Sequence, residues 1–363
     1  MKNLFSKMGL LVGLSLALVA CNTDQEDDQL PHIAGTAGAY VLNQGNQGNG
    51  IDGKLTYVDF EDMVPVHNLF QSANGKSMGM SPQDGVIYGS KLYIAVHGSN
   101  TVWAIDRSSR KILGQIATNA PQGLAAVDGA IYVANNDGYV TKIDTTALKV
   151  VTKTEVGPNP VDIEARNGDL YVSISDGYNF GKGYENGFRL AKVSLSNFSK
   201  VGDVKVGMNP GKMTQDRNGN IFVVCNGDYQ TILPTIYRVA IDDKASEYAE
   251  GNIIAAHGDQ LFVANHAVIY DKNWKVTSQK NEYYVMNTKD HQKVTGHLWA
   301  ANKVKNPIAL NINPNTGELF LTSRNDKNEV SANGQLTVFD RLGALKNTIG
   351  MGVEPYAVIF DIR

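Results

Sequence analysis

The sequence predicts an all-β protein with one architecture, a seven-bladed β-propeller. The first observation is a short apolar segment with an aromatic residue in second place, which occurs seven times at intervals of 39 to 58 residues. The second observation is that another strand-like segment follows each copy. Repeats of this size made of strands are typical of four-stranded sheets arranged radially around an axis. The apolar segments are 39–43, 92–96, 131–135, 170–174, 221–225, 261–265 and 319–323.

The segment after each copy alternates apolar and polar side chains, as half-exposed strands do. We interpret it as the third strand of a blade and the aromatic-bearing segment as the second. Most copies end in Asp or Asn, whose side chains bond the backbone two residues on in turns. A catalytic role for these acids is an alternative, but a single active site has no use for seven copies. These segments are 54–59, 101–106, 139–144, 189–194, 236–242, 283–287 and 336–340.

Proline marks the start of the first strand in most blades, because it fixes φ and has no N–H to donate. The C-terminal segment 356–362 has the pattern of a first strand with no blade after it, and 39–42 is a second strand with no first strand before it. We therefore expect the C-terminal strand to pair with the N-terminal blade and close the ring. The propeller is predicted to comprise residues 36–363. The prolines are Pro82, Pro121, Pro160, Pro210, Pro307 and Pro355.

Residues 1–20 are predicted to be a signal peptide. Lys2 and Lys7 precede an uncharged run that is too short to span a bilayer. The run ends in small residues followed by Cys21, a pattern similar to a bacterial lipobox, so Cys21 would be lipidated. An ordinary secretory signal is the alternative. Residues 21–35 are predicted to be a disordered acidic tether, because 22–28 contain four acids and no apolar side chain.

Cysteine content and charge exclude two classes of protein. Cys225 is the only cysteine besides Cys21, so no disulfide can form in the mature chain, and a buried inert thiol is expected. The formal net charge is −3 and the chain has no run of Lys and Arg. Nucleic-acid binding needs clustered basic residues, so no nucleic-acid partner is expected.

The longest loops are all predicted to lie on one face of the ring. Turns from second to third strand share a face with the connections between blades, and five of them are long and rich in Gly, Asn and Tyr. Binding residues concentrate on such loops when a rigid scaffold carries them. Tolerated insertions are the alternative, because surface loops lengthen at little cost. The loops are 43–53, 175–187, 226–234, 265–281 and 323–334.

Residues on these loops and at the nearby strand ends form the predicted ligand-binding rim. It is rich in amides, tyrosines and histidines and carries little charge, which suits a polar ligand with amide or hydroxyl groups. Asp162, Lys212 and Asn252 border this rim. The candidate ligand-binding residues are Gln83, His97, Gln122, Asn135, Tyr178, Tyr229, His266, Arg324 and Tyr356.

Catalytic signals are weak. No nucleophile elbow, Walker loop or zinc-protease motif occurs, so no catalytic residue and no metal ligand is assigned. His97, His266 and Asp162 could meet across the ring as in propeller lactonases and lyases, but a metal site needs three or four converging ligands with outer support. Asp144, Thr145 and Thr146 fit a loose acceptor pattern for O-glycosylation.

With a lipobox, an acidic tether and Asn-Pro blade junctions, the chain resembles the YncE-like seven-bladed surface lipoproteins of Bacteroides. The start of the mature domain, 40–45 followed by 54–59, is similar to the BtuG-type vitamin B12-binding lipoproteins. The tether resembles the signal that exports such proteins to the outer face of the outer membrane. The resemblance implies a lipid-anchored, outward-facing protein that works with a TonB-dependent outer-membrane transporter.

The expected function is therefore capture of vitamin B12 or a related corrinoid on the long-loop face and its transfer to that transporter. The chain would not be an enzyme and would hold no cofactor, since the cobalamin is cargo. A lactonase- or lyase-like enzyme using His97 and His266 is one alternative. A glycan-binding or structural surface protein is another.

Overall fold

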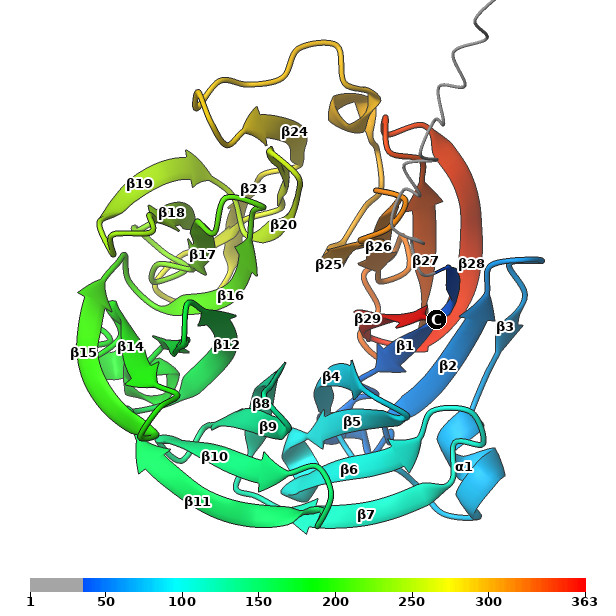
Figure 1. The fold of residues 1–363 in the computed structure, drawn as a ribbon. Helices are drawn as coiled ribbons and strands as arrows, with labels where there is room; N and C mark the ends of the chain where they lie inside the picture. Colours follow the sequence, from blue (N-terminus) through cyan, green and yellow to red (C-terminus); the bar gives the residue numbers. More distant parts are fainter. Residues whose placement is uncertain (1–34) are drawn as a thin grey trace, which may run out of the picture. The chain divides into compact units, whose positions relative to one another are not determined.

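The computed structural model describes residues 35–363, which form seven antiparallel sheets set as blades around a central axis (Figure 1). The predicted seven-bladed β-propeller is confirmed. The predicted signal peptide and nearly all of the predicted tether lie outside the described residues, as does Cys21. Within residues 35–363, no helix is long and apolar enough to cross a membrane.

Each blade is a meander that runs outward from the axis. Blade 1 contains β29 (Pro355–Ile362), β1 (Thr36–Asn43), β2 (Lys54–Asp59) and β3 (Pro65–Val66). Blade 2 contains β4 (Pro82–Tyr88), β5 (Lys91–Val96), β6 (Thr101–Asp106) and β7 (Ile112–Ala117). Blade 3 contains β8 (Pro121–Val127), β9 (Ala130–Asn135), β10 (Tyr139–Asp144) and β11 (Lys149–Glu155). Blade 4 contains β12 (Pro160–Arg166), β13 (Asp169–Ile174), β14 (Arg189–Ser194) and β15 (Ser199–Lys205).

The remaining blades follow the same order, with one exception. Blade 5 contains β16 (Pro210–Gln215), β17 (Ile221–Cys225), β18 (Thr235–Val239) and β19 (Ala245–Glu250). Blade 6 has three strands, β20 (Ile253–His257), β21 (Gln260–Asn265) and β24 (Glu282–Asn287), and carries a hairpin of β22 (Val268–Tyr270) and β23 (Val276–Gln279). Blade 7 contains β25 (Pro307–Ile312), β26 (Leu319–Ser323), β27 (Asn333–Phe339) and β28 (Leu345–Val353). Short helices are α1 (Leu69–Asn74), η1 (Gln47–Asn49), η2 (His97–Ser99), η3 (Gly177–Lys182) and η4 (Leu298–Ala301).

Two expectations about the blades need correction. The prediction of four strands in every blade was wrong for blade 6. There the chain after β24 runs through η4 instead of forming a fourth strand. The third strands are also more buried than their alternation suggests: β6 is buried along nearly its whole length, whereas the fourth strand β11 is almost entirely exposed. A third strand is covered on both faces by neighbouring blades, so polar residues in it are fewer than in the outer strand.

The ring closes as predicted, by pairing of the two chain ends of the domain. β29 runs antiparallel to β1, with Tyr40 opposite Ile359 and Leu42 opposite Ala357. A charged clasp secures this blade to the next one. Arg107 of blade 2 binds the buried carboxylate of Asp361 in β29, which also accepts a 3.0 Å hydrogen bond from Tyr57 Oη.

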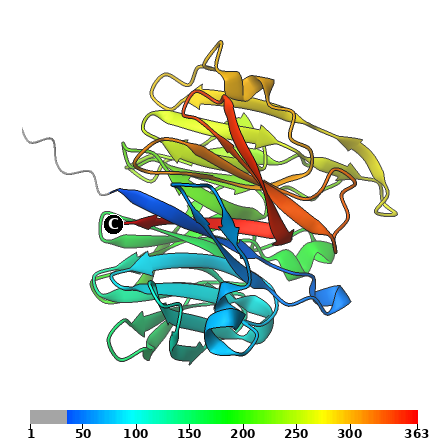
Figure 2. The same ribbon diagram turned by 90° about the vertical axis from the view of Figure 1, so that its right-hand side faces the viewer.

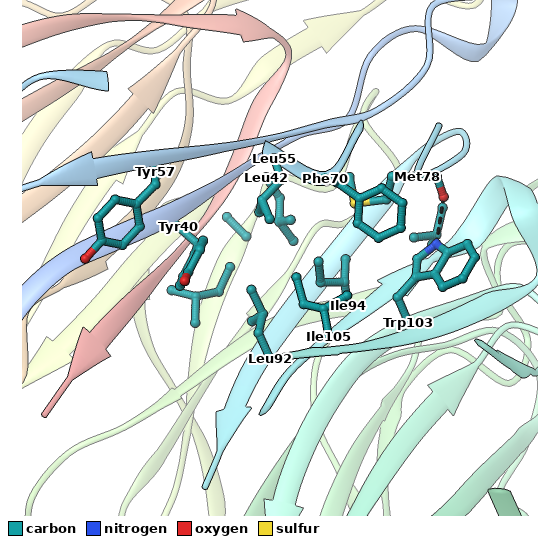
Figure 3. Close-up of a cluster of buried hydrophobic side chains, with 13 residues drawn as sticks. Tyr40, Leu42, Leu55, Tyr57, Phe70, Met78, Leu92, Ile94, Trp103 and Ile105 are labelled. Carbon is teal, nitrogen blue, oxygen red and sulfur yellow. Dashed lines mark hydrogen bonds between the residues drawn. The ribbon is translucent and has the colours of Figure 1, made fainter. Parts of the chain in front are cut away.

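The recurrent aromatic residue in second strands packs between blades. Tyr171 Oη donates to Asp243 at 2.6 Å, and Asp243 lies in the turn between the third and fourth strands of the following blade. Phe320 makes the equivalent contact through its ring, which stacks on Phe60 of blade 1 with centroids 5.2 Å apart. The apolar faces of blades 1 and 2 meet in the same way, and Figure 3 shows Tyr40 beside Tyr57 and Phe70 beside Trp103 in this contact.

Left-handed residues before the junction prolines fix where each second strand ends. Asn159 and Asn209 have φ of 50° and 57°, a conformation that Asn tolerates better than most residues. Their carbonyls accept the N–H of the first residue after the second strand, from Ser175 at 3.1 Å and Asn226 at 2.9 Å. In six of the seven blades, this bond sets the equivalent residue at the long-loop face. The six pairs are His97–Ser81, Asn136–Ala120, Ser175–Asn159, Asn226–Asn209, Arg324–Asn306 and Gln44–Glu354.

We predict that Asp361→Asn lowers the free energy of unfolding by about 1–3 kcal/mol, because it weakens the clasp at the closing blade and leaves the Arg107 charge without its partner. Urea unfolding followed by circular dichroism measures this. Asp242→Asn is the matched control, because its partner Lys244 is 85% exposed. The control should change stability by no more than about 0.5 kcal/mol. Equal effects of the two substitutions would contradict the role of the clasp.

Candidate functional site

The long-loop face of the ring is the candidate binding site. The five long loops all connect a second strand to a third, so they emerge at the same ends of the blades. Figure 2 shows the β22–β23 hairpin in yellow and the η3 loop in green projecting on one side of the propeller. The predicted loop 265–281 contains an antiparallel strand pair, β22 and β23, and is not irregular along its whole length.

Three blades are linked across this face by one asparagine. The Asn136 Nδ2 of blade 3 donates to His97 Nε2 of blade 2 at 3.2 Å and to Tyr178 Oη of blade 4 at 3.3 Å. His97 Nε2 is the acceptor, so the ring is neutral with its proton on Nδ1. Burial lowers the pKa of His97, which is consistent with a neutral ring at neutral pH. These two hydrogen bonds join blades 2, 3 and 4 on the long-loop face.

An aromatic ridge, formed by Phe180, Tyr229, Tyr270 and Trp274, lies over blades 4, 5 and 6. Phe180 and Trp274 meet edge to face with ring centroids 6.2 Å apart, and Tyr270 lies 5.8 Å from Trp274. Phe180 is 58% exposed, Trp274 51% and Tyr229 36%, whereas Tyr270 is half-buried. The Phe180 and Trp274 rings, which come from blades 4 and 6, touch each other and offer an exposed apolar surface to a ligand.

Carboxylates at the base of the loops hold the ridge in shape. Asp228 accepts the backbone N–H of Gln230, Thr231 and Ile232, all within 2.7–2.9 Å, and its pKa is held low by these bonds despite the opposing effect of burial. Asp271 accepts two N–H groups in the turn of the β22–β23 hairpin. Such turns order the backbone without help from a ligand, so the loops are preorganised.

The η3 loop is anchored from below. Asp176 Oδ2 accepts from Asn186 N at 2.9 Å and from Asn179 Nδ2 at 3.2 Å, which ties the two ends of the loop together. Asn159, the left-handed junction residue, accepts the N–H of Tyr178 at 3.0 Å. The same asparagine therefore sets a blade junction and the start of a candidate binding loop.

The part of the long-loop face formed at the strand ends of blades 6 and 7 is polar and charged. Arg324 of blade 7 forms an ion pair with Glu354, the left-handed residue before β29. His266 of blade 6 contacts the amide of Gln279, and its backbone N–H donates to Asn252 Oδ1 at 2.7 Å. Burial lowers the pKa of His266, and the positive charge of Arg324 lowers it further.

The other candidate residues occupy different depths. Gln83 accepts a 2.9 Å hydrogen bond from Gln44 Nε2, and Gln122 is partly exposed near the start of β8. Asn135 is only 1% exposed, because it is the last residue of β9 and its amide bonds Thr141 within blade 3. Asn136, one residue later, holds the position in blade 3 that His97 holds in blade 2. The sequence pattern predicted the strand that ends at Asn135, but it did not predict that Asn136 takes the position equivalent to His97.

The first strands of all seven blades line a central channel of about 490 Å³. Lys212 lies between two carboxylates, with its Nζ 3.2 Å from Asp162 and 3.8 Å from Asp84. Burial would lower the pKa of Lys212, but the two carboxylates outweigh it and raise the pKa. Tyr356 lines the same channel, and burial raises its pKa. The two carboxylates therefore favour the charged form of Lys212.

Asp84 and Asp162 also join neighbouring blades. Asp84 Oδ2 accepts the N–H of Leu124 at 2.9 Å, and Asp162 Oδ2 accepts that of Met213 at 2.7 Å, each from the next first strand. Both acids stand two residues after a junction proline, a spacing visible in the sequence that could have identified Asp84. Glu164 also lines the channel, where burial and the nearby Asp162 raise its pKa to about 8.

Metal and thiol chemistry have little support among the described residues. Residues 35–363 contain no group of three or more His, Cys, Asp and Glu side chains that could hold a metal ion. Cys225 is buried and burial raises its pKa to about 12, as expected for an inert thiol.

The candidate O-glycosylation pattern, Asp144 to Thr146, lies in a turn. The Thr145 hydroxyl donates to the Gly129 carbonyl at 2.7 Å, and Asp144 caps the turn by accepting the N–H of Thr146.

Comparisons with known proteins identify the fold. No family model matches the chain, and no curated protein matches its sequence. A structure from Bacteroides uniformis, named as a candidate 6-phosphogluconolactonase, has a TM-score of 0.60 at 14% identity and covers 89% of this chain and 99% of its own. Hydrazine synthase from Kuenenia stuttgartiensis has a TM-score of 0.59 at 15% identity and covers 77% of this chain and 89% of its own. A Bacteroides caccae protein of unknown function has a TM-score of 0.50 at 13% identity and covers 90% of this chain and 99% of its own.

These identities are too low to carry a function across. They show a shared fold, which agrees with the propeller that the seven sheets of this chain form. The resemblance to BtuG-type lipoproteins stays a prediction, as do the binding roles of the nine candidate residues. What the structure adds is their arrangement: they come from all seven blades and lie on or below the long-loop face.

We predict that Glu164→Gln stabilises the protein in alkaline buffer but not in acid. The unfolded chain loses this proton near the ordinary pKa of 4.5, whereas the folded protein keeps it until about pH 8. The contribution of protonated Glu164 to the free energy of unfolding is therefore fully present below about pH 4.5 and is lost as the pH rises to about 8. At pH 9 the variant should gain on the order of 1–3 kcal/mol, reduced by water in the channel.

Thermal and urea unfolding between pH 4.5 and 9 measure the difference between variant and wild type. Glu61→Gln, which removes an exposed carboxyl, is the control and should show a flat difference. A flat difference for Glu164→Gln would show that the channel does not perturb this carboxyl.

Proposed function

We propose that this protein is an outer-membrane lipoprotein that captures vitamin B12 or a related corrinoid on the long-loop face and passes it to a TonB-dependent transporter. The observation that carries the proposal is the exposed aromatic ridge beside a ring of amide and imidazole side chains. The apolar ridge and the hydrogen-bonding rim lie on one rigid face, which is the composition of a site for a broad amphipathic ligand.

A corrinoid has the matching chemistry. Its macrocycle is flat and apolar and its edge carries amide groups, so the ring can pack on Phe180 and Trp274 while Asn136 and His97 bond the amides. The channel beneath, at about 490 Å³, is smaller than a corrinoid, so the ligand would lie across its mouth. Preordered loops favour tight binding, because little conformational entropy is lost on association.

Binding without turnover is the function we favour over a lactonase or lyase. In such an enzyme His97 and His266 would act as acid and base, and each would need a partner to orient it. The side chains that contact the two histidines are amides, Asn136 at His97 and Gln279 and Asn281 at His266, and amides do not activate a base as a carboxylate does. Sensitivity to chelators or turnover of a lactone would favour the enzyme instead.

Delivery to a transporter follows from the predicted anchor. Lipidation of Cys21 would hold the propeller at the outer membrane on the tether, and the long-loop face would turn toward the transporter. No cofactor and no nucleic acid take part in this proposal. A glycan that stacks on Trp274 is the competing ligand class for the same ridge.

Calorimetry of the mature protein with cyanocobalamin is the first test. We expect binding near one to one with nanomolar or better affinity. A flat titration would remove the corrinoid from the proposal while leaving a binding face, and a panel of glycans and lactones would then be titrated in the same cell.

Phe180→Ala and Trp274→Ala should each weaken cyanocobalamin binding about 10- to 100-fold, because each removes one of two contacting rings. Tyr178→Ala should weaken it through the loss of the Asn136 contact. None of the three should lower the melting temperature much, since all are exposed. Val201→Ala, which truncates an exposed apolar side chain on β15, is the control and should leave affinity unchanged. Unchanged affinity in all three variants would place the ligand elsewhere.

A further inference from the structure

The central channel has one apolar wall and one polar wall. The first strands of blades 6 and 7, β20 and β25, contribute mainly apolar residues to its lining, including Ile254 and Ile308. The ionisable residues of the lining come from the first strands of blades 1, 2, 4 and 5. They are Tyr356, Asp84, Asp162, Glu164 and Lys212. A cavity that combines apolar residues with a few converging polar groups has the composition of a small-molecule site.

Most polar side chains of the channel already have partners. Asp84 and Asp162 each accept an N–H of the next first strand, and together they flank the Nζ of Lys212. Thr214 and Asn311 likewise accept N–H groups of the next first strand, at 3.0 and 3.2 Å. These bonds join neighbouring blades, so the groups that make them belong to the scaffold.

Two polar side chains of the lining are left over. Neither the Glu164 carboxyl nor the Tyr356 hydroxyl forms a hydrogen bond or an ion pair with any residue of 35–363. Both first strands begin with a junction proline at the long-loop face, one residue before Tyr356 and four residues before Glu164. With a rise of about 3.3 Å per residue, the Glu164 backbone lies about 10 Å deeper in the channel. Polar groups enclosed without a protein partner are bonded by water or by a ligand.

The charges of the channel leave one carboxyl group without a counterion. The lining contains the carboxyl groups of Asp84, Asp162 and Glu164, and Lys212 is its only basic residue. Burial and the nearby Asp162 raise the pKa of Glu164 to about 8, although Lys212 opposes this shift. A cation beside Glu164 would remove the cost of its negative charge. Residues 35–363 hold no cluster of His, Cys, Asp and Glu fit for a metal ion, and the apolar wall suits a carbon chain.

We propose that this channel is a binding site for a small aliphatic amine, with its ammonium group on Glu164 and its carbon chain along the apolar wall. A hydroxyl at the other end of the ligand bonds Tyr356, and a linear chain of about six carbons is long enough to reach both groups. The cavity of about 490 Å³ holds such a molecule together with water. The site lies below the long-loop face and does not depend on the proposed corrinoid binding.

Calorimetry of the mature protein with 6-amino-1-hexanol at about pH 8.5 tests the proposal. We expect binding with a Kd below about 1 mM. Hexane-1,6-diol has the same length without the charge, and it should bind at least about tenfold more weakly. Glu164→Gln should weaken binding of the amino alcohol at least about tenfold, and Tyr356→Phe about threefold. Glu61→Gln removes an exposed carboxyl outside the channel and should leave the affinity unchanged.

The pH dependence of binding separates pairing with Glu164 from adsorption by charge. A protonated carboxyl cannot pair with an ammonium group, so the affinity should rise at least about tenfold between about pH 6.5 and 8.5. An aliphatic amine stays protonated throughout, since its pKa is about 10.4. The raised pKa values of Lys212 and Tyr356 keep the lysine charged and the phenol neutral over this range. The other charged groups that face Glu164 in the channel are Asp84 and Asp162.

Glu164→Gln should make the remaining binding independent of pH, and its melting temperature shows whether the variant is folded. A flat titration of the wild type, equal affinity for the diol, full affinity in Glu164→Gln or a wild-type affinity that does not change with pH would each overturn the proposal. Cyanocobalamin binding can succeed or fail without changing any of these results.

Discussion

Packing between adjacent blades is the constraint on which the rest of this structure depends. A single four-stranded sheet has two apolar faces and cannot bury either of them alone, so each blade is stable only between two others. The aromatic residue in every second strand serves this contact: Tyr171 bonds the outer turn of blade 5 and Phe320 stacks on Phe60 of blade 1. In an open row of blades, the first and the last blade would each leave one apolar face uncovered. Pairing of β29 with β1 joins the last blade to the first, so every blade has a neighbour on both sides.

The same constraint creates the candidate site. Each blade junction needs a chain reversal before the next first strand, and at every junction except the one before blade 6 a left-handed residue followed by proline provides it. The carbonyl of that residue binds the residue after the second strand, which fixes His97, Asn136 and Arg324 at equivalent places on one face. Side chains from distant parts of the sequence thus form a ring with regular spacing. The long loops rise from this ring, and Asp176 and Asp228 order two of them through hydrogen bonds to their own backbone.

Blade 6 shows how a departure from the repeat produces surface properties that the other blades lack. Its second loop is lengthened into the β22–β23 hairpin, which carries Trp274 to Phe180 two blades away. Its fourth strand is replaced by the η4 segment, which leaves a groove and a partly free edge.

The sequence by itself determined the number of blades, the position of most second and third strands and the closing role of the C-terminal strand, because these depend on local alternation and on a repeat that is visible along the chain. It also identified the five long loops and the face that carries them. The contacts between blades were decided only by the tertiary structure, because they join residues that no local pattern links: Asn136 with His97 and Tyr178, Phe180 with Trp274, and Lys212 between Asp84 and Asp162. A shift of one residue at a strand end reverses which side chain is buried, and only the bond to the junction carbonyl fixes that register.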